Sequence, residues 1–252
     1  MANIRTVAEL ASDQWGLVTV RQARLLDVTP QSMAKMALAG GLVRIAHGIY
    51  RLVGSPSHEH EELRAAWLSL DPARTAGERI LDPDVEMVSH RSAARVRGLG
   101  DLAADVMEFT VPRRRQSRRH DVRLHRGAVT EVDWNLVDGL PVAMAARTID
   151  DLAAERVDRG HLSGIVRDAL SRGQAQPDEL VRVLARHTRA YGMGVGGGAR
   201  LLEVLQDEVP DRSAQELLTA VDPTVVQAVM SSLDPALLRA IVRQMQSRPE
   251  DE

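Results

Sequence analysis

The sequence predicts a mainly helical α+β fold, and three observations support that prediction. Apolar residues recur at helical spacing through much of the 252-residue chain. Shorter apolar runs are bounded by glycine or polar residues, as strands usually are. Hydrophobic residues make up 44% of the chain, which supports a buried core, although aromatic residues are only 2%. We therefore expect an N-terminal domain over residues 1–55, a larger α+β domain over 56–190 and a helical extension over 191–252.

The N-terminal domain begins with two predicted helices. Residues 4–14 carry apolar side chains at helical spacing and form the first. Thr19 suits a helix N-cap, and Gln22 follows three residues later, which is the spacing of a capping box. The second helix is therefore expected over residues 20–26. Its inner face is predicted to hold Val20, Ala23 and either Leu25 or Leu26.

A third helix and two strands follow. Thr29 is a second predicted N-cap, and proline occupies the next position, where a missing N–H is tolerated. The helix covers residues 30–39 and ends at a glycine pair, because helices often end on a glycine with left-handed backbone. Residues 42–45 and 49–52 are expected to form strands around a short turn that contains glycine.

This order of helix, tight turn, helix and two-stranded wing is that of a winged helix-turn-helix, whose second helix enters the DNA major groove. The outer face of helix 30–39 is predicted to present Gln31, Ser32 and Lys35. Glutamine can pair with adenine edges, lysine with guanine, and serine with a base or a phosphate. Basic side chains of the wing suit phosphates, which position a protein on DNA without specifying sequence.

A second basic segment lies between predicted strands at residues 107–111 and 122–125. Its loop, residues 112–121, carries five arginines in the seven positions 113–119. Neighbouring guanidinium groups repel one another unless a polyanion pairs with them, so the loop is expected to contact the DNA backbone. The alternative is a solvated hairpin tip.

The charge distribution agrees with DNA at the front of the chain. Residues 1–52 hold six basic and three acidic residues, whereas residues 127–252 hold 13 basic and 20 acidic ones. The predicted DNA-contacting residues are Thr19, Arg21, Gln22, Thr29, Gln31, Ser32, Lys35, Arg44, His47, Arg51, Arg113, Arg114, Arg115, Arg118 and Arg119.

The rest of the chain is predicted to be mostly helical. Ser89 caps a helix that Gly98 ends. Other helices are expected at residues 57–70, 142–155, 161–172 and 177–187, and three or four short ones in the last fifty residues. Residues 192–198 form a flexible glycine-rich joint.

Catalytic chemistry is not expected, so the sequence predicts no enzyme, no cofactor and no metal. The chain has no cysteine, and its one lysine is Lys35, so neither a P-loop nor a carboxylate–x–Lys nuclease core can be built. Residues 192–197 fit G-x-G-x-x-G but follow a helix rather than a strand. His58 and His60 are two positions apart and do not share a helix face, so they are not expected to bind a metal ion together. No long apolar run or signal pattern is present, which favours the cytoplasm over a membrane.

Several motifs in order resemble the AbiEi-type antitoxins. They are residues 40–44 (GGLVR), 48–51 (GIYR), 88–94 (VSHRSAA), 98–99 (GL), 109–112 (FTVP) and 147–153 (RTIDDLA). The resemblance covers roughly residues 4–190, and the segment after Gly198 matches nothing diagnostic.

The resemblance implies a transcriptional repressor that is also the antitoxin of a type IV toxin–antitoxin system. Such a protein binds double-stranded DNA at repeats in its own promoter. Its second domain is associated with neutralising a nucleotidyltransferase-like toxin without a stable complex. Some proteins with this N-terminal half carry a nuclease domain, which the missing carboxylate–x–Lys pattern argues against here. A stand-alone regulator and a protein-interaction module remain alternatives, because a fold alone does not give function.

Overall fold

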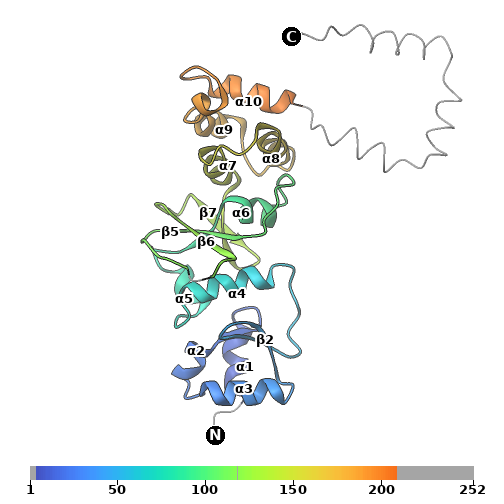
Figure 1. Ribbon diagram of the computed structural model, residues 1–252, viewed down its shortest axis with the longest axis vertical. Coiled ribbons are helices and arrows are strands. Elements are labelled where there is room, and N and C mark those ends of the chain that lie inside the picture. The colour runs from blue at the N-terminus through green and yellow to red at the C-terminus, as the bar shows by residue number, and fades with distance from the viewer. Residues whose placement is uncertain (1–3, 118, 209–252) are drawn as a thin grey trace, which may run out of the picture. The chain divides into compact units, whose positions relative to one another are not determined.

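The computed structural model describes residues 4–117 and 119–208, which belong to one compact unit (Figure 1). The fold is α+β and mainly helical, as predicted: an N-terminal winged helix precedes a larger domain of mixed sheet and helices. The short helices expected in the last fifty residues lie almost entirely outside the described residues. No helix in the described part of the chain is long and apolar enough to cross a membrane.

The N-terminal elements follow the predicted order, with one strand added. They are α1 (Ile4–Ser12), β1 (Leu17–Thr19), α2 (Val20–Leu25), α3 (Pro30–Leu38), β2 (Leu42–Ala46) and β3 (Ile49–Leu52). The unpredicted β1 pairs with β3, so the wing is a three-stranded antiparallel sheet in the order β1-β3-β2. Val7, Val18, Ala23 and Met33 form the centre of a small core between these elements.

The helix caps are confirmed, and the predicted inner face of α2 is correct at Val20 and Ala23 but wrong at Leu25 and Leu26. Thr19 and Gln22 make a capping box, and the side chain of Thr29 accepts a hydrogen bond from the Ser32 amide. However, Leu25 is 72% exposed, and Gln22 is buried instead. Gln22 faces inward because its amide bonds with Gln14 and with a backbone carbonyl of the second domain.

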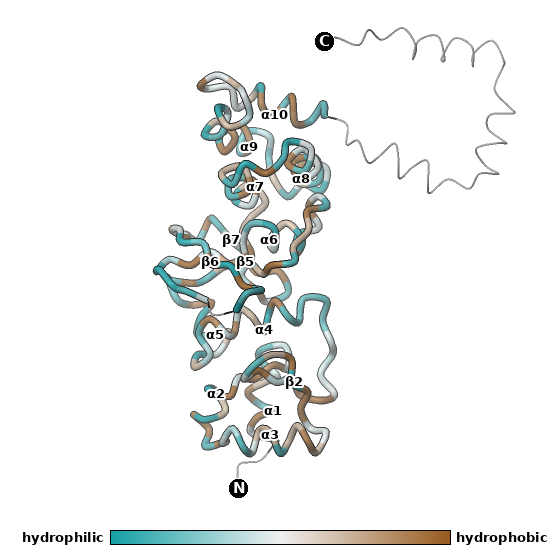
Figure 2. The backbone as a smooth tube through the Cα atoms, viewed as in Figure 1, coloured by the Kyte–Doolittle hydropathy of each residue, from teal (hydrophilic) through white to brown (hydrophobic). Residues whose placement is uncertain are grey.

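The second domain is built on a five-stranded sheet in the order β6-β5-β4-β8-β7. Its strands are β4 (Met87–Val88), β5 (Met107–Val111), β6 (Val122–Arg126), β7 (Trp134–Val137) and β8 (Leu140–Ala143). Strands β5 and β6 run parallel, so the arginine-rich loop is a crossover and not a hairpin tip. This crossover is strongly hydrophilic along its described length (Figure 2).

Helices cover both faces of the β5–β6 part of this sheet (Figure 1). On one face, Phe109 packs in a core with Trp67 of α4 (Glu61–Leu70). Alternate residues point to the opposite face, where α6 (His90–Arg97) and α7 (Ala145–Ala154) lie. That face is polar in its β5–β6 part, since it carries Glu108, Thr110, Arg123 and His125.

With α7, four later helices form the end of the described unit: α8 (Arg159–Ser171), α9 (Pro177–Leu184), the short 3-10 helix η1 (Thr188–Tyr191) and α10 (Gly198–Asp207). The short α5 (Ala76–Ile80) lies beside α4 instead, where the Arg79 guanidinium donates to the Trp67 carbonyl (Figure 1). The helix predicted from residue 142 is wrong at its start, because Val142 belongs to β8 and α7 begins at Ala145. Helix α10 shares a core with α7, α8 and α9. The division at residues 55 and 190 stays a prediction.

Gly198 has a packing role rather than the role of a flexible joint. It is buried at the start of α10, and a Cβ at this position would overlap the carbonyl oxygen of Val181 in α9. The glycine therefore lets the two helices approach closely.

Candidate nucleic-acid interface

Helix α3 presents the polar face that the sequence predicted. Gln31 and Lys35 are exposed, whereas Ser32 is half-buried and its hydroxyl lies 3.0 Å from the Thr29 hydroxyl. Met33, on the opposite side, is fully buried. The buried side of the helix holds it in place, while the exposed side of its first turns is accessible to a binding partner.

The wing and the start of α2 add positive charge beside this helix. Arg21, Arg44 and His47 are all exposed. The Arg44 guanidinium lies 3.2 Å from Nδ1 of His47, at the turn of the wing. No carboxylate in residues 4–117 or 119–208 lies within ion-pair distance of Arg21 or Arg44, so both remain available to an anion.

Two predicted contacts, Thr19 and Gln22, are structural instead. They are 1% and 2% exposed, so DNA cannot reach them. The Thr19 hydroxyl donates to the Pro72 carbonyl at 2.5 Å, and the Gln22 side-chain amide donates to the Arg74 carbonyl at 2.8 Å. Both side chains therefore connect the winged helix to the α4–α5 segment.

Arg51 is also engaged within the protein. Its guanidinium makes an ion pair with Glu61 at 2.7 Å and donates to the Ser55 carbonyl at 2.9 Å. Only 18% of its side chain is exposed. Arg51 therefore fixes the segment that leaves the wing instead of serving as the predicted DNA contact.

The arginine-rich crossover has its own acidic partners. Arg113 pairs with Asp84, Arg115 pairs with Glu86 at 2.7 Å, and Arg119 pairs with Asp121 at 2.6 Å. The expectation that only a polyanion could relieve their repulsion is therefore wrong. Arg114 is exposed with no ion pair to another described residue, and Arg118 lies outside the described residues.

Arg115 holds the crossover on a buried network. It donates to both Glu86 and the Leu70 carbonyl. The other oxygen of Glu86 accepts from Arg79 at 2.8 Å, and the Arg79 guanidinium lies 3.6 Å from the centre of the Trp67 ring. Burial lowers the pKa of Arg79 below its ordinary value, and the charge of Glu86 opposes that shift. The position of the loop thus depends on a carboxylate that two arginines share.

The winged helix and the crossover line one cavity of about 1100 Å³. Arg21, Arg44 and His47 contribute from the first domain, and Arg115 and Arg119 from the second. The structure therefore brings together two basic sets that are about 70 residues apart in the sequence. The base-reading candidates Gln31, Ser32 and Lys35 lie outside this lining.

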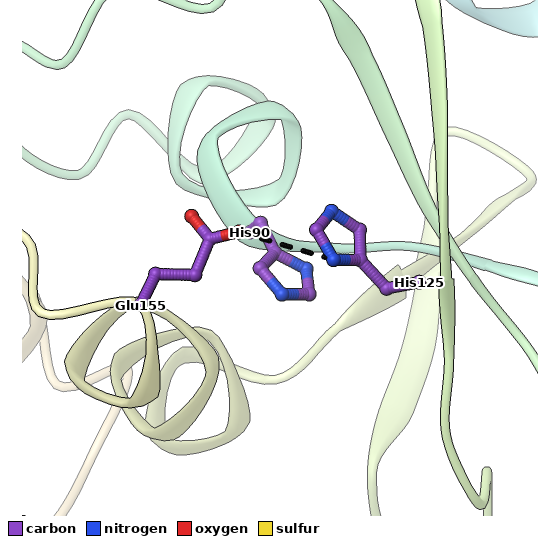
Figure 3. A group of neighbouring side chains, drawn as sticks. All are labelled: His90, His125 and Glu155. Atoms are coloured by element: carbon purple, nitrogen blue, oxygen red, sulfur yellow. Dashed lines mark ion pairs between the residues drawn. The ribbon is translucent and has the colours of Figure 1, made fainter.

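A second polar cluster, which the sequence did not reveal, lies on the polar sheet face under α6 and α7. The rings of His90 and His125 stack at 3.5 Å between centroids and 14° between planes, and Glu155 lies beside them (Figure 3). His90 adopts a left-handed backbone with φ of 52°, which is uncommon outside glycine. Burial and the neighbouring His125 lower the pKa of His90 to about 3.

Carboxylates surround the two rings. Glu108 is 1% exposed and lies 3.2 Å from Nε2 of His125. Burial opposes ionisation of Glu108, but its hydrogen bonds from His125 and the Arg91 amide hold its pKa below the ordinary range. Burial raises the pKa of Asp151, whose Oδ2 lies 3.8 Å from Nδ1 of His90.

The cluster fits a metal ion poorly as it stands. Two nearly parallel rings 3.5 Å apart cannot both direct an in-plane lone pair at one ion. The Glu155 carboxylate is also held by Arg91 at 2.7 Å. Ser89 is the N-cap residue of α6 and Gly98 ends this helix, as predicted, but the Ser89 hydroxyl bonds to His90 Nδ1 at 2.9 Å and caps no backbone amide.

One comparison with known proteins identifies the front of the chain. Residues 5–53 match the family model described as "Transcriptional regulator, AbiEi antitoxin". No curated protein matches the chain. The matched segment spans α1 to β3 and thus the whole winged helix. The winged helix of this chain is therefore of the kind found in the AbiEi antitoxin family of transcriptional regulators, which confirms the resemblance at the N-terminus.

Proposed function

We propose that this protein is a repressor that binds a specific sequence in double-stranded DNA through α3. The observation that supports this most is the exposed polar start of α3 beside Arg21 and Arg44, which make no ion pair with a described residue, within the segment that matches a regulator family. A helix in this position of a winged helix enters the major groove.

In this proposal the contacts divide into two kinds. Gln31 and Lys35 read base edges, and Ser32 reads a base or bonds to a phosphate. Arg21, Thr29, Arg44 and His47 hold the backbone next to the reading helix, and Arg114 adds charge from the crossover. Arg113, Arg115 and Arg119 contribute a weaker field, because each has an acidic partner.

We further propose that the operator lies in the promoter of its own operon and that the protein acts as a type IV antitoxin in the cytoplasm. The support is the family match together with the ordered motifs beyond residue 53. The partner is a nucleotidyltransferase-like toxin with which no stable complex forms. In this scheme, residues 1–55 bind DNA, residues 56–190 carry the antitoxin role, and residues 191–252 form an extension.

A gel-shift titration of the full chain tests the DNA-binding proposal. The two probes are the region upstream of its own gene and a scrambled duplex of equal length and composition. We expect a shift at lower protein concentration on the first probe, because base contacts add to the backbone affinity. Equal shifts on both would refute sequence-specific repression. No shift at low salt would favour the protein-interaction module.

Coexpression with the product of the adjacent gene tests the antitoxin role. If that gene encodes a nucleotidyltransferase, its expression alone should stop growth, and the present protein should restore it. Persistent growth arrest would leave a stand-alone regulator as the better description.

A further inference from the structure

The cavity between the winged helix and the crossover has the size of a small-ligand site. Its volume is about 1100 Å³, and ligand pockets commonly hold about 300–1,000 Å³. A cube of that volume has an edge of about 10 Å, whereas the major groove alone of duplex DNA is about 12 Å wide. A whole duplex is wider than its major groove and therefore does not fit inside the cavity.

The charge of the lining favours an anion. Three of its five arginines, Arg21, Arg24 and Arg44, have no carboxylate within ion-pair distance in the described part of the chain. The lining acids are Glu62 and Asp121, and Asp121 is already paired with Arg119. An excess of unpaired guanidinium groups remains, and guanidinium suits phosphate because it can donate two parallel hydrogen bonds.

The rest of the lining is suited to a base and a sugar. Ile45, Leu70 and Leu124 supply apolar surface, and the exposed residues His47 and His120 also line the cavity. Flat rings stack on nucleobases with little sequence preference. We propose that this cavity binds a free nucleotide that carries two or three phosphates, with Arg21, Arg24 and Arg44 on the phosphates.

Such a ligand is coupled to DNA binding if the proposed function holds. Arg21 and Arg44 belong both to the cavity and to the proposed backbone contacts. A phosphate held by them competes with the DNA phosphates for the same donors, and this coupling is reciprocal. The nucleotide would therefore weaken operator binding, and the operator would weaken nucleotide binding by the same factor.

Calorimetric titration of the full chain without DNA tests the site. The probes are adenosine and guanosine di- and triphosphates, with inorganic pyrophosphate and the unphosphorylated nucleosides for comparison. We expect saturable binding of at least one di- or triphosphate, weaker binding of pyrophosphate, and none of the nucleosides. The informative variant is Arg24→Ala, because this side chain is exposed and makes no ion pair with a described residue. Loss of its charge-assisted hydrogen bonds should weaken binding at least about tenfold.

The matched control is Arg126→Ala, which removes an exposed arginine at the end of β6 outside the cavity lining. It should bind the nucleotide as the unmodified chain does. Absence of saturable binding by every nucleotide would overturn the proposal, as would equal affinities of the Arg24 variant and the unmodified chain. Because the titration contains no DNA, none of these results tests the DNA-binding proposal.

Discussion

Replacement of Glu86 by glutamine should destabilise the second domain and loosen the arginine-rich crossover at once. The Glu86 carboxylate lies between Arg79, whose side chain is 1% exposed, and Arg115, whose side chain is 41% exposed. Loss of the negative charge leaves the Arg79 guanidinium buried without a counter-charge, which costs about 3–5 kcal/mol. The Arg115 pair is largely solvated and adds at most about 1 kcal/mol. Glutamine keeps one carbonyl acceptor, so we expect the free energy of unfolding to fall by about 3 kcal/mol in total.

Urea unfolding measures this change directly. With a slope of about 2 kcal/mol per molar urea, the midpoint should fall by roughly 1.5 M. The matched control is Arg115→Gln, which removes the exposed half of the network and should lower the free energy of unfolding by at most about 1 kcal/mol. If Glu86→Gln changed stability by less than the control, the buried pair would contribute little, and the argument from burial would be wrong.

Four further predictions follow from local geometry. Lys35→Ala should weaken operator binding by about 1–3 kcal/mol with little effect on scrambled DNA, and an equal loss on both would show a phosphate contact. Arg114→Ala should reduce the slope of log affinity against log salt by about 0.9, and an unchanged slope would remove the crossover from the interface. The pKa of His90, about 3, lies below its ordinary value of 6.5, so the unfolded chain takes up the proton first and stability falls as pH drops below about 6.5. Between pH 7.5 and pH 5 the free energy of unfolding should fall by roughly 2 kcal/mol. In the His90→Asn variant, whose asparagine tolerates the left-handed backbone, urea titrations should show little of this fall. Gly198→Ala should lower the melting temperature by several degrees, whereas Gly194→Ala, where a Cβ meets nothing within 4 Å, should not.

Local signals made the winged helix predictable. The capping box at Thr19 and the Thr-Pro start of α3 involve residues within three positions of one another. Such contacts are visible in a sequence because the helix itself fixes their distance. The β7–β8 hairpin had an equally local signal, since Asp138 and Gly139 form a turn with φ of 47° and 79°. This turn places Leu140–Ala143 in a strand, which is why the helix predicted from residue 142 begins only at Ala145.

Contacts distant in the sequence could not be predicted in this way. Arg115 was expected to need a polyanion, yet Glu86 supplies its charge from 29 positions away. His90 and His125 meet only because β5 and β6 run parallel, which depends on a crossover whose direction no short motif specifies. The surface position of Gln31 and Lys35 on α3 was therefore predictable, whereas the acidic partners of Arg113 and Arg115 were not.

The buried joint between the winged helix and the α4–α5 segment has a mechanical consequence. Thr19 caps α2 and, through the same hydroxyl, holds the Pro72 carbonyl, while Gln22 closes the capping box and holds the Arg74 carbonyl. The second domain cannot move relative to the winged helix at this point without breaking the N-cap of α2. Together with the shared core of Leu17, Ile49 and Trp67, these hydrogen bonds couple the orientation of the winged helix to that of the second domain.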